Sequence, residues 1–263
     1  MPCMKTFLLS IRAAFGLFAV ILMAAPSTQA SYFTNYGNFT GTTVNFLGVS
    51  ESSVSESIPL YHNPNVAGNT LDFNPQNFGA FASGSGGIDL TDGQLSLTMM
   101  AHAGSAIPTI KFWEVGDYSL LGAGTAGTLV DVTANFYINI TKVDGAPITP
   151  VNLGGTMTFT PVASGTLTLP ANPGFGQLWG GVINFDINNA LTLANVPYLY
   201  GATEVQFTLD NELIAISELG TIARIQKKDF QGSVGIEVIV PEPSILALTL
   251  CGAGLLISRR AKR

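Results

Sequence analysis

Cysteine is nearly absent from this chain of 263 residues, which contains only Cys3 and Cys251. Both lie in segments near the two ends, and the span 31–240 between those segments has none. No disulfide can form within that span, so its stability has to come from a hydrophobic core. At this length a single all-β domain with a sizeable core is feasible.

Positive charge is also scarce. The span 31–240 carries 5 Lys and Arg residues against 16 Asp and Glu, a formal charge of −11, whereas the whole chain has −6. A nucleic-acid partner is therefore excluded, because phosphate binding needs clustered cations. We expect Lys227-Lys228, the only basic pair in this span, to be a solvated strand end.

Catalytic motifs are missing as well. The two histidines are His62, in an Asn/Pro-rich loop, and His102, at the end of an expected strand. No Gly-x-Ser-x-Gly elbow accompanies them, and without cysteine a Cys–His pair is excluded. HExxH, CxxC and a glycine-rich phosphate loop before a helix are absent too. The sequence predicts that this protein is not an enzyme.

The first thirty residues have the layout of a secretory signal peptide. Lys5 and Arg12 give a positive start without acids, and an apolar stretch follows from Ala13 to Ala25. The small residues after Pro26 lead to a predicted cleavage site after Ala30. We therefore exclude 1–30 from the fold and expect the protein to be exported.

The last residues form a three-part segment, 241–263. Pro241-Glu242-Pro243 is a stiff, extended peptide, because proline fixes φ and removes backbone donors. An apolar run from Ile245 to Ile257 follows, roughly 20 Å long as a helix and short for a full membrane span of about 30 Å. A basic end closes the chain and is expected to stay on the cytoplasmic side; it contains Arg259, Arg260, Lys262 and Arg263.

This tripartite segment resembles the PEP-CTERM sorting signal of exosortase-processed bacterial proteins. The resemblance implies recognition of Pro241-Glu242-Pro243 by an exosortase-type membrane transpeptidase and removal of the tail. It also implies transient inner-membrane anchoring through 245–257, before release or attachment at the cell envelope, at the cell surface or outside the cell. The family is associated with bacteria that make extracellular polysaccharide, which makes such a polymer a candidate partner. Ile245, where the family often has Thr, and Cys251 depart mildly from its pattern.

Between these ends, the pattern is that of short strands. From Leu129 to Val143, apolar and polar residues alternate with a period of two, which predicts a strand with one buried face. Glycine, threonine, serine and asparagine are common and helical periodicity is nearly absent. The stretch Glu212 to Gln226 is ambiguous, but Asn211, Gly220 and its β-branched residues favour strands.

Several breaks between strands can also be predicted. We expect Ser50 to Ser57 to be a loop and Asn63 to Gly87 to be a long irregular excursion with short strands at 70–73 and 79–82. Asp92-Gly93 predicts a hairpin turn, and Gly116-Asp117 a break between two strands. The last strand, Ser233 to Val240, is expected to carry the tail from the edge of a sheet.

About ten to twelve strands with one-sided alternation predict two packed antiparallel sheets. The fold class is thus all-β: a β-sandwich over 31–240, with the jelly roll as one candidate arrangement, between the signal peptide and the C-terminal hydrophobic sorting helix.

Acidic residues offer two weaker hypotheses. A polysaccharide-acting hydrolase would need two facing carboxylates in a cleft; the candidates are Asp89, Asp92, Glu114, Asp117, Asp186 and Glu204. Calcium is the one cofactor that the sequence leaves open, since loop carboxylates bind it in many acidic sandwiches; the candidates are Asp72, Asp89, Asp92, Asp117 and Asp144.

Trp113 and Trp179 are the candidate contacts for a sugar ring, and Trp179 is the better candidate for an exposed aromatic. The first hypothesis is an exported surface or extracellular-matrix protein with a non-catalytic structural or adhesive role. The alternative is a carbohydrate-binding module, which exposure of either tryptophan in a shallow groove would favour. A hydrolase ranks third.

Overall fold

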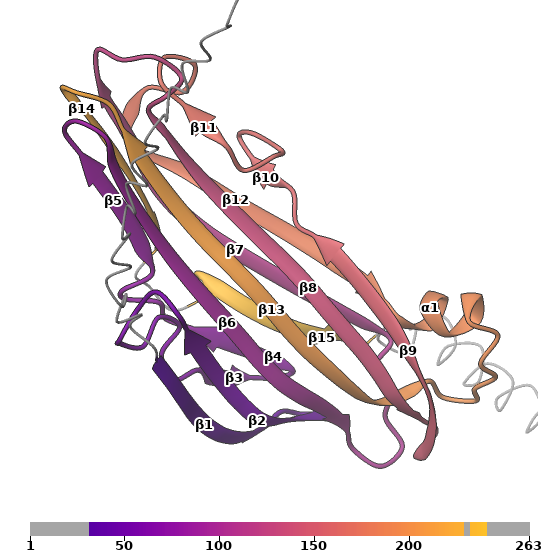
Figure 1. Ribbon diagram of the computed structural model, residues 1–263. Helices are drawn as coiled ribbons and strands as arrows, with labels where there is room; N and C mark the ends of the chain where they lie inside the picture. Colours follow the sequence, from indigo (N-terminus) through magenta and orange to yellow (C-terminus); the bar gives the residue numbers. More distant parts are fainter. Residues whose placement is uncertain (1–31, 229–231, 241–263) are drawn as a thin grey trace, which may run out of the picture.

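The computed structural model describes residues 32–228 and 232–240 (Figure 1). These residues form two antiparallel β-sheets packed face to face, which confirms the predicted β-sandwich. Figure 1 looks onto one sheet, with the other behind it. The signal peptide with its cleavage site at Ala30, and the sorting segment 241–263, lie outside the described residues.

The front sheet has seven strands in the order β1-β2-β6-β13-β8-β11, with β9 also paired to β8. Its bounds are β1 (Tyr32–Thr40), β2 (Val44–Ser53), β6 (Gly87–Ala101), β8 (Leu129–Val143), β9 (Ala146–Thr156), β11 (Leu167–Thr168) and β13 (Ala202–Ser217). The long strands β6, β13 and β8 form its centre and curve across the molecule (Figure 1).

The back sheet has eight strands in the order β10-β12-β7-β15-β4-β3, with β14 paired to both β7 and β5. Its bounds are β3 (Asn65–Ala67), β4 (Thr70–Phe73), β5 (Gly79–Ser83), β7 (Thr109–Gly122), β10 (Phe159–Thr160), β12 (Gly174–Asp186), β14 (Thr221–Lys227) and β15 (Val234–Ile239). One edge of β7 is shared, since β15 pairs with its first half and β14 with its second.

The core lies between the two sheets and follows from the alternation in the sequence. Strand β8 matches its predicted range, and its residues at even positions from Val130 to Ile140 are buried. Phe136 of β8 packs edge-on against Phe112 of β7, with ring centroids 5.1 Å apart, and against Phe207 of β13 at 5.8 Å. This aromatic cluster packs the two sheets together, and such packing stabilises a domain that has no disulfides.

Two predicted breaks do not exist, because glycine has another role there. Gly93 lies inside β6, where a Cβ would come within 2.8 Å of the Phe78 ring. Gly116 lies inside β7, where a Cβ would come within 2.2 Å of the Trp179 ring. In both strands the glycine makes room for an aromatic ring and marks no turn.

The predicted loop at Ser50 to Ser57 is also partly wrong, since β2 continues to Ser53. Glu51 explains the extension: its carboxylate is nearly fully buried and accepts the backbone N–H groups of Leu60 and Tyr61 at 2.8 and 2.7 Å. These bonds tie the following segment back onto the strand. The short strands predicted at 70–73 and 79–82 are present as β4 and β5.

The position of the last strand differs from the prediction. β15 lies inside the back sheet, between β7 and β4, and not at an edge. In this position Val234, Ile236 and Val238 are buried in the core. The stretch 212–226 forms strands, as favoured.

One helix, α1 (Ile187–Leu193), follows β12. Within the part of the chain that the structure describes, no helix is long and apolar enough to cross a membrane.

Candidate functional site

The two tryptophans singled out from the sequence lie on neighbouring strands of the back sheet, at one hollow of about 720 Å³ on its outer face. Strand β7 contributes Lys111, Trp113 and Val115, which alternate outward while Phe112 and Glu114 point into the core. Strand β12 forms the facing side with residues 178–182. The rim is formed by Thr160 of β10 and by Thr158, which directly precedes that strand.

Trp113 is partly buried and is fixed from two sides. Its indole Nε1 donates to the carbonyl of Gly232 at 3.0 Å. Its ring lies on Gly235 of β15, the residue directly opposite in the strand pairing, where a Cβ would come within 2.2 Å of Cζ2. An indole that rests on a glycine in this way is held close to the sheet, and the remaining surface of its ring borders the hollow.

Charged groups stand beside this ring. Lys111 Nζ lies 5.1 Å from the centre of the Trp113 ring and 3.8 Å from the carboxylate of Glu237. Asp72 lies across Gly235 from Trp113 in the strand pairing, and burial, followed by the nearby Glu237, raises the pKa of its carboxyl. One cation, Lys111, and two acids, Glu237 and Asp72, thus lie near the aromatic surface of Trp113.

The opposite side of the hollow is apolar with hydroxyls at its edge. Leu178 and Val182 are exposed, by 69% and 53%, on the outer face of β12. Gly180 stands between them and leaves the gap that deepens the hollow. Thr158 and Thr160 are exposed at the β10 side. The site therefore combines an aromatic ring, aliphatic walls and a few polar groups, which is the usual make-up of a small-ligand site.

Trp179 does not have the exposure expected of it. Its side chain is only 3% exposed, its indole Nε1 donates to the carbonyl of Asp117 at 3.2 Å, and it packs edge-on against Phe159. The reason is strand parity: Trp179 alternates with Leu178 and Gly180, so it faces inward when they face outward. Of the two tryptophans, Trp113 is the one whose ring borders the outer hollow as a contact surface.

The carboxylates considered for hydrolysis are engaged in structural contacts. Asp89 accepts the N–H of Phe81 at 2.7 Å, and Asp92 accepts that of Val54 at 3.2 Å. Asp186 caps the start of α1 through the N–H of Asn189 at 2.8 Å. None of these three forms a pair with another carboxylate across a hollow.

The other three acids of that group bind lysines. Glu204 pairs with Lys142 at 2.7 Å and Asp117 with Lys228 at 2.5 Å. Glu114 is fully buried and pairs with Lys227, which is also fully buried. The prediction that Lys227 lies at a solvated strand end is therefore wrong, because it occupies an inward position on β14; its neighbour Lys228 is partly exposed.

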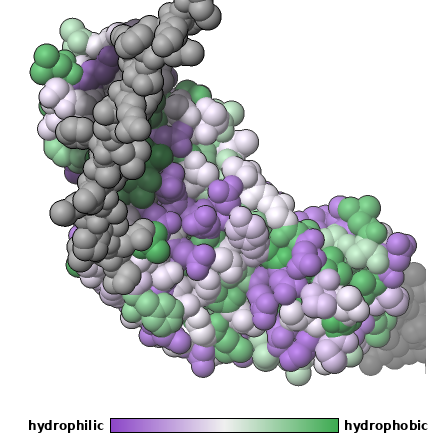
Figure 2. All heavy atoms as spheres, in the orientation of Figure 1, coloured by the Kyte–Doolittle hydropathy of each residue, from purple (hydrophilic) through white to green (hydrophobic). Residues whose placement is uncertain are grey.

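Acids do gather on the outer face of the front sheet, where hydrophilic side chains run across the middle of the view in Figure 2. Asp92, Asp210 and Glu212 lie on the adjacent strands β6 and β13, and Asp131 lies on β8. Burial, followed by the neighbouring acids, raises the pKa of Asp210 and of Glu212. Asp210, Glu212 and Asp131 were missed from the sequence because strand order, which brings them together, was unknown.

Calcium candidates are scattered. Among the residues described, no group of three or more His, Cys, Asp or Glu side chains could hold a metal ion. Asp144 instead accepts the N–H groups of Leu199, Tyr200 and Gly201 at 2.6, 2.8 and 3.1 Å, and these bonds lower its pKa. The histidines bind asparagines: His62 contacts Asn77 at 3.3 Å and His102 contacts Asn45 at 3.0 Å.

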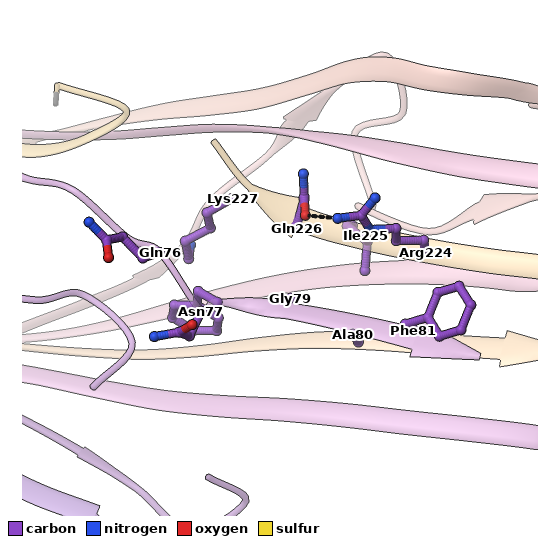
Figure 3. A pocket seen from close by; sticks show the side chains of 10 residues that line it. Gln76, Asn77, Gly79, Ala80, Phe81, Arg224, Ile225, Gln226 and Lys227 are labelled. Atoms are coloured by element: carbon purple, nitrogen blue, oxygen red, sulfur yellow. Dashed lines mark hydrogen bonds between the residues drawn. The ribbon is translucent and has the colours of Figure 1, made fainter. Parts of the chain in front are cut away.

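A second hollow, of about 450 Å³, lies over the paired strands β5 and β14 (Figure 3). On β14, Arg224 donates to its neighbour Gln226 at 2.5 Å, and Gln226 donates in turn to Asp117 at 3.2 Å. Two polar groups of this hollow, Arg224 and Gln226, are thus engaged with each other, in contrast to the open aromatic surface at Trp113.

No family model matches this chain, and no curated protein does. Solved structures give remote likenesses. The carbohydrate-binding module TmCBM61, in complex with β-1,4-galactotriose, has a TM-score of 0.22 at 6% identity over 80% of this chain and 88% of that one. The family 11 xylanase from Neocallimastix patriciarum has 0.18 at 8% over 75% and 100%. Endoglucanase 3 of Trichoderma harzianum, from family GH12, has 0.22 at 9% over 82% and 100%. Likenesses this remote carry no functional information, which has to come from the site itself.

Proposed function

We propose that this protein is an exported carbohydrate-binding protein that holds an extracellular polysaccharide on the outer face of its back sheet. The observation that carries the proposal is Trp113, whose ring is fixed on Gly235 and borders a wide, shallow hollow. The apolar face of a sugar ring stacks on such a surface, while its hydroxyls bond to polar groups at the edge.

The rest of the hollow suits a sugar chain. Leu178 and Val182 offer exposed apolar surface on the side facing Trp113, and Thr158, Thr160 and Lys111 offer hydroxyls and an ammonium group. The hollow is open, which suits a polymer that continues beyond the bound units.

Export and sorting complete the proposal. The signal peptide ending at Ala30 and the segment built on Pro241-Glu242-Pro243 would send the domain through the inner membrane to an exosortase-type transpeptidase and then to the cell envelope or beyond. A non-catalytic role is supported by the structural contacts of the six acids considered for hydrolysis. Calcium is not needed for stacking on Trp113 and would act, if bound, elsewhere in the domain.

Binding to polysaccharides with and without a tryptophan at position 113 tests the proposal. Neutral and acidic bacterial polysaccharides would be titrated in a calorimeter, with and without calcium. Trp113→Ala is expected to weaken binding about 30-fold or more, since a central aromatic contact commonly contributes about 2 kcal/mol or more.

Tyr137→Ala is the matched control, because Tyr137 is an aromatic residue exposed by 61% on the outer face of the front sheet. It should bind as the wild type does. Loss of binding in Tyr137→Ala but not in Trp113→Ala would place the sugar on the front sheet and contradict the proposed site. No binding to any polymer would favour a surface protein with a purely structural or adhesive role.

A further inference from the structure

Three polar side chains meet in the middle of the hydrophobic core, and their positions carry an inference independent of the sugar site. Glu114 comes from β7, Lys227 from the end of β14, and Asn211 from β13 of the opposite sheet. Each residue is at most 2% exposed. Buried charges and amides of this kind are uncommon in a sandwich core and call for a reason.

One carboxylate oxygen joins the other two residues. Glu114 Oε2 accepts a hydrogen bond from Asn211 Nδ2 at 2.8 Å and another from Lys227 Nζ. Two donors on one oxygen lie no more than about 6 Å apart. The amine of Lys227 and the amide of Asn211 are thus held on the same carboxylate oxygen.

Three aromatic rings surround the amine of Lys227, and burial among them removes it from water. Phe78, Trp179 and Tyr61 place their ring centres 4.6, 5.7 and 5.9 Å from Lys227 Nζ. Burial lowers the pKa of Lys227, and Glu114 partly opposes that effect. Glu114 Oε1 and Asn211 Oδ1 have no hydrogen-bond partner, so one oxygen on each side of the reacting groups is free.

We propose that Lys227 and Asn211 join covalently through an isopeptide bond, formed within the folded domain with Glu114 as the acid–base group. Glu114 takes a proton from the ammonium of Lys227, which leaves a lone pair on Nζ. Nζ bonds to Cγ of Asn211, and the carbonyl π electrons move to Oδ1.

The second half of the reaction releases ammonia. Glu114 gives its proton to Nδ2 of Asn211 and takes one from Nζ. The carbonyl re-forms, the Cγ–Nδ2 bond breaks and ammonia leaves. One amide and one ammonia replace one amine and one amide, so no oxidant, metal or other reactant is required. Lys227 and Phe78 are also among the residues that line the hollow over β5 and β14, so we expect ammonia to leave on that side. Lys227 is labelled in Figure 3.

The bond would connect the two sheets. Asn211 belongs to the front sheet and Lys227 to the back sheet, and no cysteine occurs in 31–240 to do this. A covalent link between the layers would suit a domain that works outside the cell without disulfides.

Peptide mass spectrometry of the full chain tests the link. A double digest cuts after Lys and Arg with trypsin and after Glu with a glutamyl endopeptidase. A linked protein yields peptide 205–212 joined to peptide 225–228, because a modified Lys227 resists trypsin. The joined mass should be lower than the sum of the two peptides by about 17 Da, the mass of ammonia. Free 205–212 together with free 225–227, and no joined form, would overturn the proposal.

Two variants examine the roles. Glu114→Gln keeps the size of the side chain but cannot accept the proton, so it should give free peptides; a full yield of joined peptide would overturn the role of Glu114. Lys227→Met should give 205–212 at full mass. If that peptide still lacks about 17 Da, Asn211 has closed onto its own backbone, and the proposed link is wrong. The wild-type digest decides whether the link exists, however well the variants fold.

Discussion

Gly235→Ala tests how the Trp113 ring, the proposed sugar contact, is held, without changing any side chain that faces the hollow. The added methyl group would come within 2.2 Å of Trp113 Cζ2 and 2.5 Å of Cη2, so the indole has to leave its position. Overpacking of this kind costs about 1–3 kcal/mol. Loss of the bond from Nε1 to Gly232 adds about 1 kcal/mol, and the reduced freedom of the unfolded chain offsets about 0.5 kcal/mol.

The expected result is a loss of about 1.5–3.5 kcal/mol, which lowers the Tm by about 3–14 °C for a domain of this size. The chain has two tryptophans, so a Trp179→Phe background leaves Trp113 as the only indole. Its emission should shift to longer wavelength in Gly235→Ala as the ring moves into water. Polysaccharide binding should weaken together with it.

Gly154→Ala is the matched control. Gly154 also lies in a strand, β9, but a Cβ there would meet only the carbonyl of Phe136 at an ordinary 3.4 Å. Its effect should stay within about 1 kcal/mol. The reasoning is refuted if Gly235→Ala costs as much in a Trp113→Ala background as in the wild type, because the ring would then not be the cause.

Two further predictions concern pH. Asparagine tolerates the left-handed backbone at position 144 (φ 50°), so Asp144→Asn removes only the charge. Because the pKa of Asp144 is lowered in the folded state, the variant should be less stable than the wild type at neutral pH. The difference in Tm should disappear as the pH falls through that pKa. A gap that does not change with pH would contradict this. Glu212→Gln should be more stable than the wild type at pH 7, because burial and the neighbouring acids raise the pKa of Glu212 and the wild type loses stability as the pH rises through it. The gain should vanish below about pH 4. Thermal unfolding that shows no gain at pH 7 would argue against a cost of burial and repulsion at this site.

The sequence was informative where side chains alternate and uninformative where strands pair. The period of two from Leu129 to Val143 predicted β8 with its correct bounds, and the lack of helical periodicity predicted the all-β class. Two predictions based on glycine were wrong, because β6 and β7 continue through the expected breaks. Glycine at positions 93 and 116 is typical of a turn, but here its missing side chain makes room for the rings of Phe78 and Trp179. Those rings lie elsewhere in the sequence, so the local pattern could not indicate them.

The buried cluster could have been found in part. Ile110, Phe112 and Glu114 share one parity on β7, so a strand whose first two apolar residues face inward places Glu114 in the core as well. The same reasoning places Lys111 and Trp113 together outside. No local pattern shows that Asn211 and Lys227 contact Glu114. The contact with Lys227 depends on the pairing of β14 with β7, and the contact with Asn211 depends on how the two sheets are stacked.

The position of β15 has a consequence for when the domain can fold. Among the residues that the structure describes, the β3–β4 hairpin joins the back sheet only through β15, which is the last of their strands. Until residues 234–239 are available, the first half of β7 has an open edge, and the pairing that closes it spans more than a hundred residues. The back sheet would therefore stay incomplete until the last strand has been synthesised. If the protein is exported as proposed, the chain would still be incompletely folded when it enters a secretion channel, which is the state that such a channel can thread.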